Sequence, residues 1–227
     1  MSGFDEEKLR AAALDFLYLM DHGYPRKRSL ELVGNRYNMP SSERHLLQRG
    51  IFSRQESQRR KSHLLQLRQL RRARLLVDGH NVLITVESAL AGRTLVAATD
   101  GVIRDVAGLS HRYKPSALTA EAISCIIDIL LQQPPLETLF FLDRPLSRSG
   151  ELAAQLRNSL HRAGLPGDSQ AVAVPEHHLF GAQAVVASSD SAVLDRAQQG
   201  IDLAGLVVHK LARPVQLVDF SGLLHLE

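Results

Sequence analysis

Cysteine is nearly absent from this sequence, and long hydrophobic runs are absent altogether. The single cysteine, Cys125, excludes an internal disulfide and cannot by itself form a thiolate metal site. No apolar run approaches the roughly 20 residues that a membrane-spanning helix needs. The first ten residues are acidic and polar, whereas a signal peptide begins basic and continues apolar. These absences predict a cytoplasmic protein without a membrane partner.

Charge is divided unevenly along the chain. Residues 1–74 contain 16 Lys and Arg against 8 Asp and Glu, a net charge of +8. Residues 75–227 contain 11 Lys and Arg against 16 Asp and Glu, a net charge of −5. A basic segment joined to an acidic one is typical of a protein in which one part holds a polyanion and the other holds cations. A solvated, arginine-rich helical face explains the basic segment equally well.

Helical patterns fill the basic segment. Apolar residues recur at helical spacing over residues 5–20, and Gly23 and Pro25 end that helix. A short helix follows, and a third helix is expected over residues 41–53, where either of the first two serines can cap it. The succession resembles a helix-turn-helix only loosely. We predict a small all-α module over residues 1–70.

Eight basic residues lie between Arg54 and Arg74. Among them Arg71, Arg72 and Arg74 are candidate phosphate contacts for a nucleic acid, although the stretch can equally brace two domains. No aromatic residue interleaves with these basic ones, which argues against base stacking and favours contacts to the backbone. The expected binding therefore has little sequence preference.

Residues 71–227 have a different pattern, in which short apolar runs alternate with amphipathic helices. The apolar runs are 75–77, 94–98, 138–142 and 184–187, and the helical patterns include 119–132 and 148–164. Apolar strands that alternate with helices predict a doubly wound parallel sheet, an α/β fold. The carboxyl ends of such strands line the ligand crevice.

Each apolar run leads to an aspartate: Asp78, Asp100, Asp143 and Asp190. Carboxylates gathered at one edge of a sheet repel each other unless a cation compensates their charge. Mg²⁺ and Mn²⁺ prefer oxygen ligands, and such metals can activate a water for phosphodiester hydrolysis. The alternative is that each aspartate caps the following helix. For any single position capping explains the residue as well, but four recurrences favour a metal site.

The sequence resembles a known family at these positions. VDGHNVL (77–83) is similar to the opening strand of PIN-like nucleases, particularly the NYN branch, and AVVASSDSAVLDRA (184–197) is similar to their late motif. TDGVIRDVAG (99–108) and FLDRPLSRSGELA (141–153) resemble a group of archaeal and bacterial proteins in which a basic helical domain precedes a PIN-like domain. The resemblance covers nearly the whole chain.

The resemblance implies a set of metal ligands and their supports. The implied ligands are Asp78, Asp143 and Asp190, and Asp100 joins them in catalysis. Asn81 matches the asparagine that positions the end of the first strand, although a turn residue explains it too. Asp105 and Asp195 lie about one helical turn beyond Asp100 and Asp190. Each would support the metal ligands without binding the metal itself, and a position on the helix surface is the alternative for Asp195.

The candidate substrate contacts surround the aspartates. Arg144, Ser147 and Ser149 lie in a loop that enters a helix, where guanidinium and N–H groups can hold a phosphate, although turn and capping roles explain them nearly as well. Arg104 is expected to pair with Asp105 or with substrate. His80 lies close enough to Asp78 in sequence to contact substrate.

One departure from the family pattern leaves two functions open. PIN domains place an acidic residue at a helix start between the positions of Asp143 and Asp190, and here Glu176 is the candidate. The leading prediction is a metal-dependent endonuclease, with RNA favoured over DNA only by the resemblance. The first alternative is a non-catalytic nucleic-acid-binding or assembly factor. The second is a phosphoesterase for a small substrate, against which the basic segment counts. The oligomeric state stays open.

Overall fold

The computed structural model describes residues 5–106 and 113–225 and divides into two compact units. The described part of unit 1 comprises residues 5–62, 94–106 and 216–225. The described part of unit 2 comprises residues 63–93 and 113–215. Unit 1 is thus assembled from three stretches of chain, whereas the sequence predicted a single boundary near residue 70.

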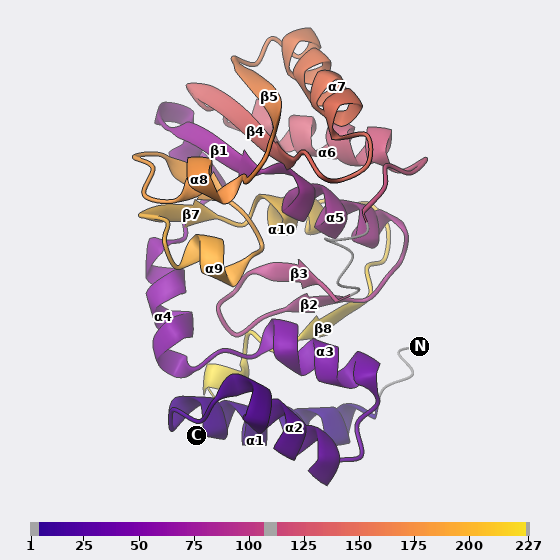
Figure 1. Cartoon of the computed structure of the whole chain (residues 1–227), viewed down its shortest axis with the longest axis vertical. Helices are drawn as coiled ribbons and strands as arrows, with labels where there is room; N and C mark the ends of the chain where they lie inside the picture. The colour runs from indigo at the N-terminus through magenta and orange to yellow at the C-terminus, as the bar shows by residue number, and fades with distance from the viewer. Residues whose placement is uncertain (1–4, 107–112, 226–227) are drawn as a thin grey trace. The chain divides into compact units, whose positions relative to one another are not determined.

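Four helices form the amino-terminal part of unit 1 (Figure 1): α1 (Glu6–Asp21), α2 (Arg26–Arg36), α3 (Ser41–Gly50) and α4 (Arg54–His63). The Asp5 carboxylate caps α1 by accepting a hydrogen bond from the main-chain N–H of Lys8 at 3.0 Å. α3 begins at Ser41 without a side-chain cap, so the expected serine cap is wrong. The predicted all-helical amino-terminal region is otherwise confirmed.

A three-stranded sheet completes unit 1, in the order β3-β2-β8. Its strands are β2 (Leu95–Ala97), β3 (Ile103–Asp105) and β8 (Leu217–Asp219), and the short 3-10 helix η3 (Leu223–His225) follows. β2 pairs antiparallel with β3 and parallel with β8. Val96 of β2 is buried in one cluster with Phe16, Leu47 and Phe220, so the helices and the sheet share a core.

The prediction that residues 94–98 belong to the parallel sheet is wrong. After β2 the chain turns back into β3, and Gly101 holds a φ of +83° in that turn. The N–H of Gly101 donates to the carbonyl of Ala98 at 2.8 Å, which closes the turn. An Asp-Gly pair between two apolar runs is a hairpin signal, so the sequence contained the correct indication.

Unit 2 contains the predicted parallel sheet. The strands are β1 (Arg74–Asp78), β4 (Glu137–Asp143), β5 (Gly167–Val172), β6 (Val185–Ala187) and β7 (Gln199–Ile201). They stand in the order β5-β4-β1-β6-β7, and every neighbouring pair is parallel. The α/β class is therefore confirmed, and β1 lies at the centre of the sheet between β4 and β6.

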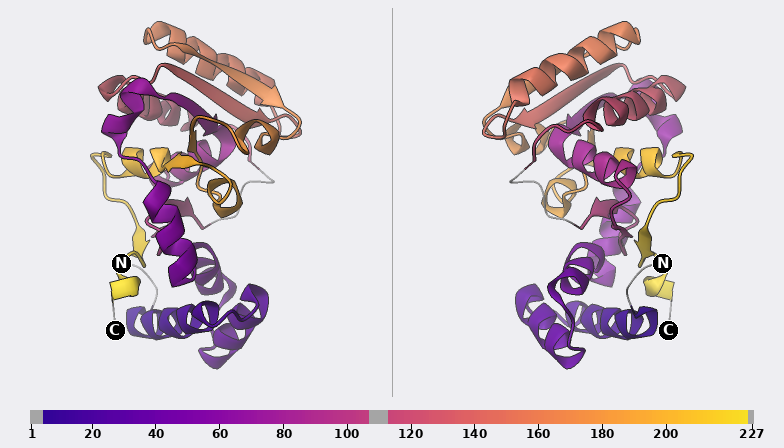
Figure 2. Two further views of the ribbon diagram at one scale, coloured as in Figure 1. Left: turned by 90° about the vertical axis from the view of Figure 1, so that its left-hand side faces the viewer. Right: turned by 90° about the vertical axis from the view of Figure 1, so that its right-hand side faces the viewer.

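Helices cover both faces of this sheet (Figures 1 and 2). One core cluster gathers side chains of α5 (Gly79–Leu90), α6 (Thr119–Gln132), α7 (Ser149–Arg162) and α10 (Leu203–Val208). A second cluster gathers side chains of α8 (Glu176–Leu179) and α9 (Ser191–Leu194). In β1, Leu75 and Val77 join the first cluster and Leu76 joins the second. This alternation places Asp78 on the α8–α9 face.

The basic stretch between the two predicted domains is not one helix. α4 ends at His63, and the 3-10 helix η1 (Leu67–Arg72) leads directly into β1. Leu64 forms a bridge with Gly200 of β7, and Leu70 of η1 is buried in the larger core of unit 2. Among the described helices, none combines the length and the apolar composition that crossing a bilayer requires.

Candidate functional site

Three aspartates meet at the carboxyl edge of the parallel sheet. Asp78 is the last residue of β1, Asp143 is the last residue of β4, and Asp190 follows β6 after two serines. Because β4 and β6 flank β1, the three positions are neighbours at one edge. The negative charges of Asp143 and Asp190 both act on Asp78, which the sequence predicted.

Asp78 is buried, with 4% of its surface exposed. Its Oδ2 accepts a hydrogen bond from Nδ2 of Asn81 at 2.5 Å and one from Oγ of Ser188 at 2.8 Å. Burial raises the pKa of Asp78 to about 6, the two hydrogen bonds oppose that rise, and the charges of Asp143 and Asp190 add to it. A cation that approaches this carboxyl group would favour its ionised form and lower its pKa.

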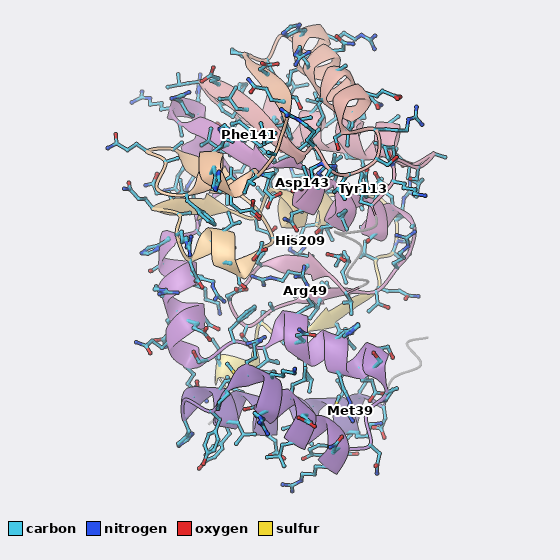
Figure 3. The ribbon with its side chains drawn as sticks, viewed as in Figure 1. Met39, Arg49, Tyr113, Phe141, Asp143 and His209 are labelled. Atoms are coloured by element: carbon cyan, nitrogen blue, oxygen red, sulfur yellow. The ribbon has the colours of Figure 1, made fainter. Side chains whose placement is uncertain are left out.

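Asp143 is half-exposed at the end of β4 (Figure 3). Its Oδ2 lies 3.1 Å from Nδ1 of His80, the second residue of α5. The main-chain N–H of Asp143 donates to the same Nδ1 at 3.0 Å. His80 is thus a neighbour of the site through Asp143, whereas the sequence suggested a direct substrate contact.

Asp190 caps α9, as expected from the alternative in which each aspartate caps the following helix. Its Oδ1 accepts a hydrogen bond from the main-chain N–H of Ala192 at 2.7 Å. The main-chain N–H of Asp190 donates to Oγ of Ser188 at 3.0 Å. Ser188 therefore links the first and third aspartates, a role that the sequence prediction missed although it noted serines at the end of this strand.

The three carboxylates suit a cation in one respect and fall short in another. Each has one oxygen that accepts no hydrogen bond from the described residues: Oδ1 of Asp78, Oδ1 of Asp143 and Oδ2 of Asp190. No group of three or more His, Cys, Asp or Glu side chains in residues 5–106 and 113–225 has the geometry of a metal site. A cation here would take several of its ligands from water or substrate, as Mg²⁺ commonly does.

Asp100 does not follow a strand of the parallel sheet, so the expectation that four strand-end aspartates share one edge is wrong for Asp100. It lies in unit 1, where its carboxylate is fully buried and forms ion pairs with Arg104 at 2.7 Å and with Arg60 at 3.1 Å. Burial by itself would raise the pKa of Asp100, but the two guanidinium groups hold it below its ordinary value. Asp100 is followed by the hairpin turn at Gly101, rather than by a strand-to-helix turn.

Arg104 and Asp105 are structural residues of the same hairpin. Arg104 is 1% exposed and donates to both oxygens of Asp100, at 2.7 and 2.8 Å, an ion pair that the sequence prediction did not include. Asp105 pairs with Arg49 of α3 at 3.3 Å (Figure 3). Asp105 is the last residue of β3, so the helical spacing from Asp100 on which its predicted supporting role rested is wrong.

The loop after β4 is held by its own main chain. The buried Ser149 hydroxyl shares its single hydrogen between the carbonyl oxygens of Asp143 and Leu146, at 2.5 and 2.6 Å, as the turn-residue interpretation expected. The guanidinium of Arg144 donates to the carbonyl of Ala171 at 3.1 Å. Ser147 is exposed and stays a candidate.

The remaining acidic candidates lie at the edges of short helices. Glu176 is the first residue of α8, the helix-start position expected for the missing acidic residue. Asp195 is exposed at the carboxyl end of α9. That position agrees with the helix-surface interpretation of Asp195.

The arginines of the basic stretch lie at the other end of the sheet. Arg71 and Arg72 are exposed in η1, immediately before β1, whereas Asp78 ends that strand. Arg74 pairs with Glu137 at 2.9 Å. A polynucleotide that contacts both Arg71 and Asp78 must therefore extend along the length of β1.

A separate hollow of about 660 Å³ lies within unit 1, between α1 and the segment around β8. It is lined by Glu6, Leu9, Arg10, Thr94, Gln216, Leu217, Val218, Asp219, Phe220, Gly222 and Leu223. None of the three aspartates lines this hollow, so the hollow and the aspartate site are different places. The aspartates are the candidate site, because a carboxyl group with a shifted pKa among like charges is a stronger sign of function than the volume of a hollow.

Comparisons with known proteins cover both parts of the chain. The family described as "Domain of unknown function (DUF5616)" matches residues 67–206, and that described as "Protein of unknown function (DUF434)" matches residues 8–63. An "Uncharacterized protein" of Methanocaldococcus jannaschii is 28% identical over 207 residues, which are 90% of this chain and 99% of that protein. No solved structure matches the chain significantly.

Proposed function

We propose that this chain, which belongs to the family described as domain of unknown function DUF5616, is a metal-dependent endonuclease with a PIN-like domain. The observation that carries the proposal is the meeting of Asp78, Asp143 and Asp190 at one edge of a parallel sheet. Burial and the charges of the other two aspartates raise the pKa of Asp78, so a cation would be favoured there.

Each residue of the site would have its own part in the reaction. The free oxygens of Asp78, Asp143 and Asp190 would hold Mg²⁺ or Mn²⁺, which would supply an activated water and stabilise the leaving oxygen of a phosphodiester. Asn81 and Ser188 fix the orientation of Asp78 by donating to its Oδ2, which leaves Oδ1 for the cation. Ser147 and the arginines of η1 would contact phosphates of a nucleic acid, and the PIN resemblance favours RNA.

A cleavage assay tests the proposal. Wild type and Asp78→Asn are incubated with mixed RNA and DNA substrates in Mn²⁺, Mg²⁺ or EDTA, and Asp128→Asn serves as a matched control because Asp128 is exposed on α6. We expect cleavage by wild type and by the control with either metal and none in EDTA. We expect Asp78→Asn to lose at least about 100-fold in rate while it still binds nucleic acid.

A second function has its own support. Asp190 is already engaged as a helix cap, and the described residues contain no three-ligand metal group. Both observations favour a non-catalytic nucleic-acid-binding factor. Binding of RNA by wild type without cleavage under any metal condition would establish this alternative and overturn the nuclease proposal.

A further inference from the structure

His80 is a buried residue at the start of α5, next to the carboxyl edge of the sheet. Only 2% of its surface is exposed, and its ring lies edge-on to that of Tyr113, with centroids 5.3 Å apart. The imidazole contacts both Tyr113 and Asp143, which Figure 3 labels. The two imidazole nitrogens have different surroundings, and these surroundings decide what the ring can do.

Nδ1 of His80 is an acceptor. The main-chain N–H of Asp143 always carries its hydrogen, and it donates to Nδ1 at 3.0 Å. A proton on Nδ1 would collide with that hydrogen, so in neutral His80 the proton belongs on Nε2. Nε2 is buried and has no hydrogen-bond partner within the part of the chain that the structure describes.

This tautomer changes the meaning of the contact between His80 and Asp143. Oδ2 of Asp143 also lies 3.1 Å from Nδ1, but an unprotonated nitrogen cannot donate to a carboxylate. The imidazole therefore holds the main chain of Asp143 without neutralising its side chain. Both carboxylate oxygens of Asp143 are then left without a hydrogen bond from His80 and are open to another partner.

The local sequence brings His80 within reach of β4. A Cβ on Gly79 would lie 2.6 Å from Cδ2 of Leu142 and 3.1 Å from the carbonyl oxygen of Phe141, so any other residue here would force Leu142 or the end of β4 to shift. The next residue, His80, contacts the end of β4, and Asn81 turns back to Asp78. Consecutive residues thus connect two aspartates that come from different strands.

We propose that His80 is a positioning residue, whose unprotonated Nδ1 anchors the main chain of Asp143 so that the Asp143 carboxylate faces a divalent cation shared with Asp78. This inference rests on the proposed function for the cation, but the anchoring itself can be measured without metal. It assigns to His80 the role of an acceptor rather than of an acid, a base or a substrate ligand.

Two substitutions test the two imidazole nitrogens of His80 separately. In His80→Asn the amide Oδ1 takes the place of Nδ1, whereas in His80→Gln a terminal atom takes the place of Nε2. Both remove the ring from Tyr113, so each is the packing control of the other. We expect the Asp143 amide to remain protected from hydrogen exchange in His80→Asn and to exchange at least about 10-fold faster in His80→Gln.

The first measurement is ¹⁵N NMR of histidine side chains without metal, with His80 identified by its absence from His80→Asn. We expect Nδ1 unprotonated and Nε2 protonated. A protonated Nδ1, or equal Asp143 exchange rates in both variants, would overturn the proposal even if the protein is an active nuclease.

The second measurement is Mn²⁺ affinity by calorimetry. We expect wild type and His80→Asn to bind similarly and His80→Gln to bind about 10- to 100-fold more weakly, the usual cost of losing a residue that orients a ligand. Equal losses in both variants would reduce His80 to a packing residue. A wild type that binds no Mn²⁺ would overturn the cation role and the proposed function, whereas the NMR and exchange results would still decide the anchoring.

Discussion

Two buried aspartates, one in each unit, have pKa values shifted in opposite directions. Asp78 of unit 2 has neutral donors, Asn81 and Ser188, and two negative neighbours, and its pKa rises to about 6. Asp100 of unit 1 has two guanidinium partners, and its pKa falls below the ordinary value. Burial is common to both, so the charge of the partners decides the direction.

The difference separates a structural residue from a candidate functional one. The carboxylate of Asp100 completes a cluster in which the guanidiniums of Arg60 and Arg104 lie 4.2 and 4.8 Å from the ring centre of Phe52. Its charge is already neutralised, so it has no need of a ligand. The charge of Asp78 is uncompensated within the described residues, and such a group is stabilised by a cation that comes from outside.

The largest effect on the free energy of unfolding is expected for Asp100→Asn. The variant removes the carboxylate that pairs with the buried Arg60 and Arg104, and breaking a buried ion pair typically costs about 3–5 kcal/mol of unfolding free energy. Denaturant unfolding at pH 7 measures it, with the surface variant Asp128→Asn as the control. A loss below about 1 kcal/mol would contradict the structural role given to this ion pair.

Asp78→Asn should have the opposite sign at neutral pH. Because the folded protein binds the Asp78 proton more tightly than the unfolded chain, ionisation of Asp78 destabilises the fold progressively between about pH 4 and pH 6. A shift from 3.8 to about 6 corresponds to about 3 kcal/mol, present in full above pH 6.

The measurement for Asp78→Asn is its unfolding free energy minus that of wild type, without metal, from pH 4 to pH 7.5. This difference should increase by about 3 kcal/mol as the pH rises and then level off. A difference that is flat across this range would remove the contrast with Asp100. A variant that is less stable at every pH would show that Asp78 is a structural residue.

A smaller effect is expected for Ser188→Ala. The change removes a donor that lowers the pKa of Asp78 and leaves the main-chain N–H of Asp190 without its acceptor. We expect a loss of about 1–3 kcal/mol at pH 7 and a pKa of Asp78 above its present value. A double-mutant cycle with Asp78→Asn measures the coupling, which should be near zero if Ser188 does not act through Asp78.

The smallest effect on stability is expected for Arg71→Ala with Arg72→Ala. Both side chains are exposed, so unfolding free energy should change by less than about 0.5 kcal/mol. Affinity for RNA should fall, and the salt dependence of binding should weaken by about one counterion for each phosphate that the arginines neutralise in the wild type. Arg74→Ala is the matched control, because Arg74 is engaged with Glu137. An unchanged salt dependence would exclude η1 from nucleic-acid binding.

The sequence predicted those parts of the fold that depend on local pattern. Asp78 and Asp143 follow apolar strands, and the alternation with helices correctly placed both at one sheet edge. Asp100 follows an apolar strand too, but the turn at Gly101 reverses the chain, and its partner Arg60 is distant in sequence. A strand ending in aspartate is thus compatible with both environments, and only the residues that surround it in space distinguish them.

The anchoring of Asp143 by His80 was beyond prediction for a similar reason. A histidine two residues after Asp78 suggested a contact with substrate, since proximity in sequence is all that a motif shows. The contact with the main chain of β4 depends on how closely α5 approaches that strand, which the absence of a side chain on Gly79 permits.

The three-segment construction of unit 1 has a consequence for how the protein is made. Its amino-terminal helices emerge first from the ribosome, yet Val96 and Phe220 of their core come from two later segments, the second close to residue 227. Contacts between residues so far apart in sequence slow folding, because the intervening loop must close before they form. A fragment that stops at residue 63 would therefore expose the apolar surface of α1 and α3 and aggregate, and unit 1 should become protease-resistant during synthesis only after Phe220 has been added.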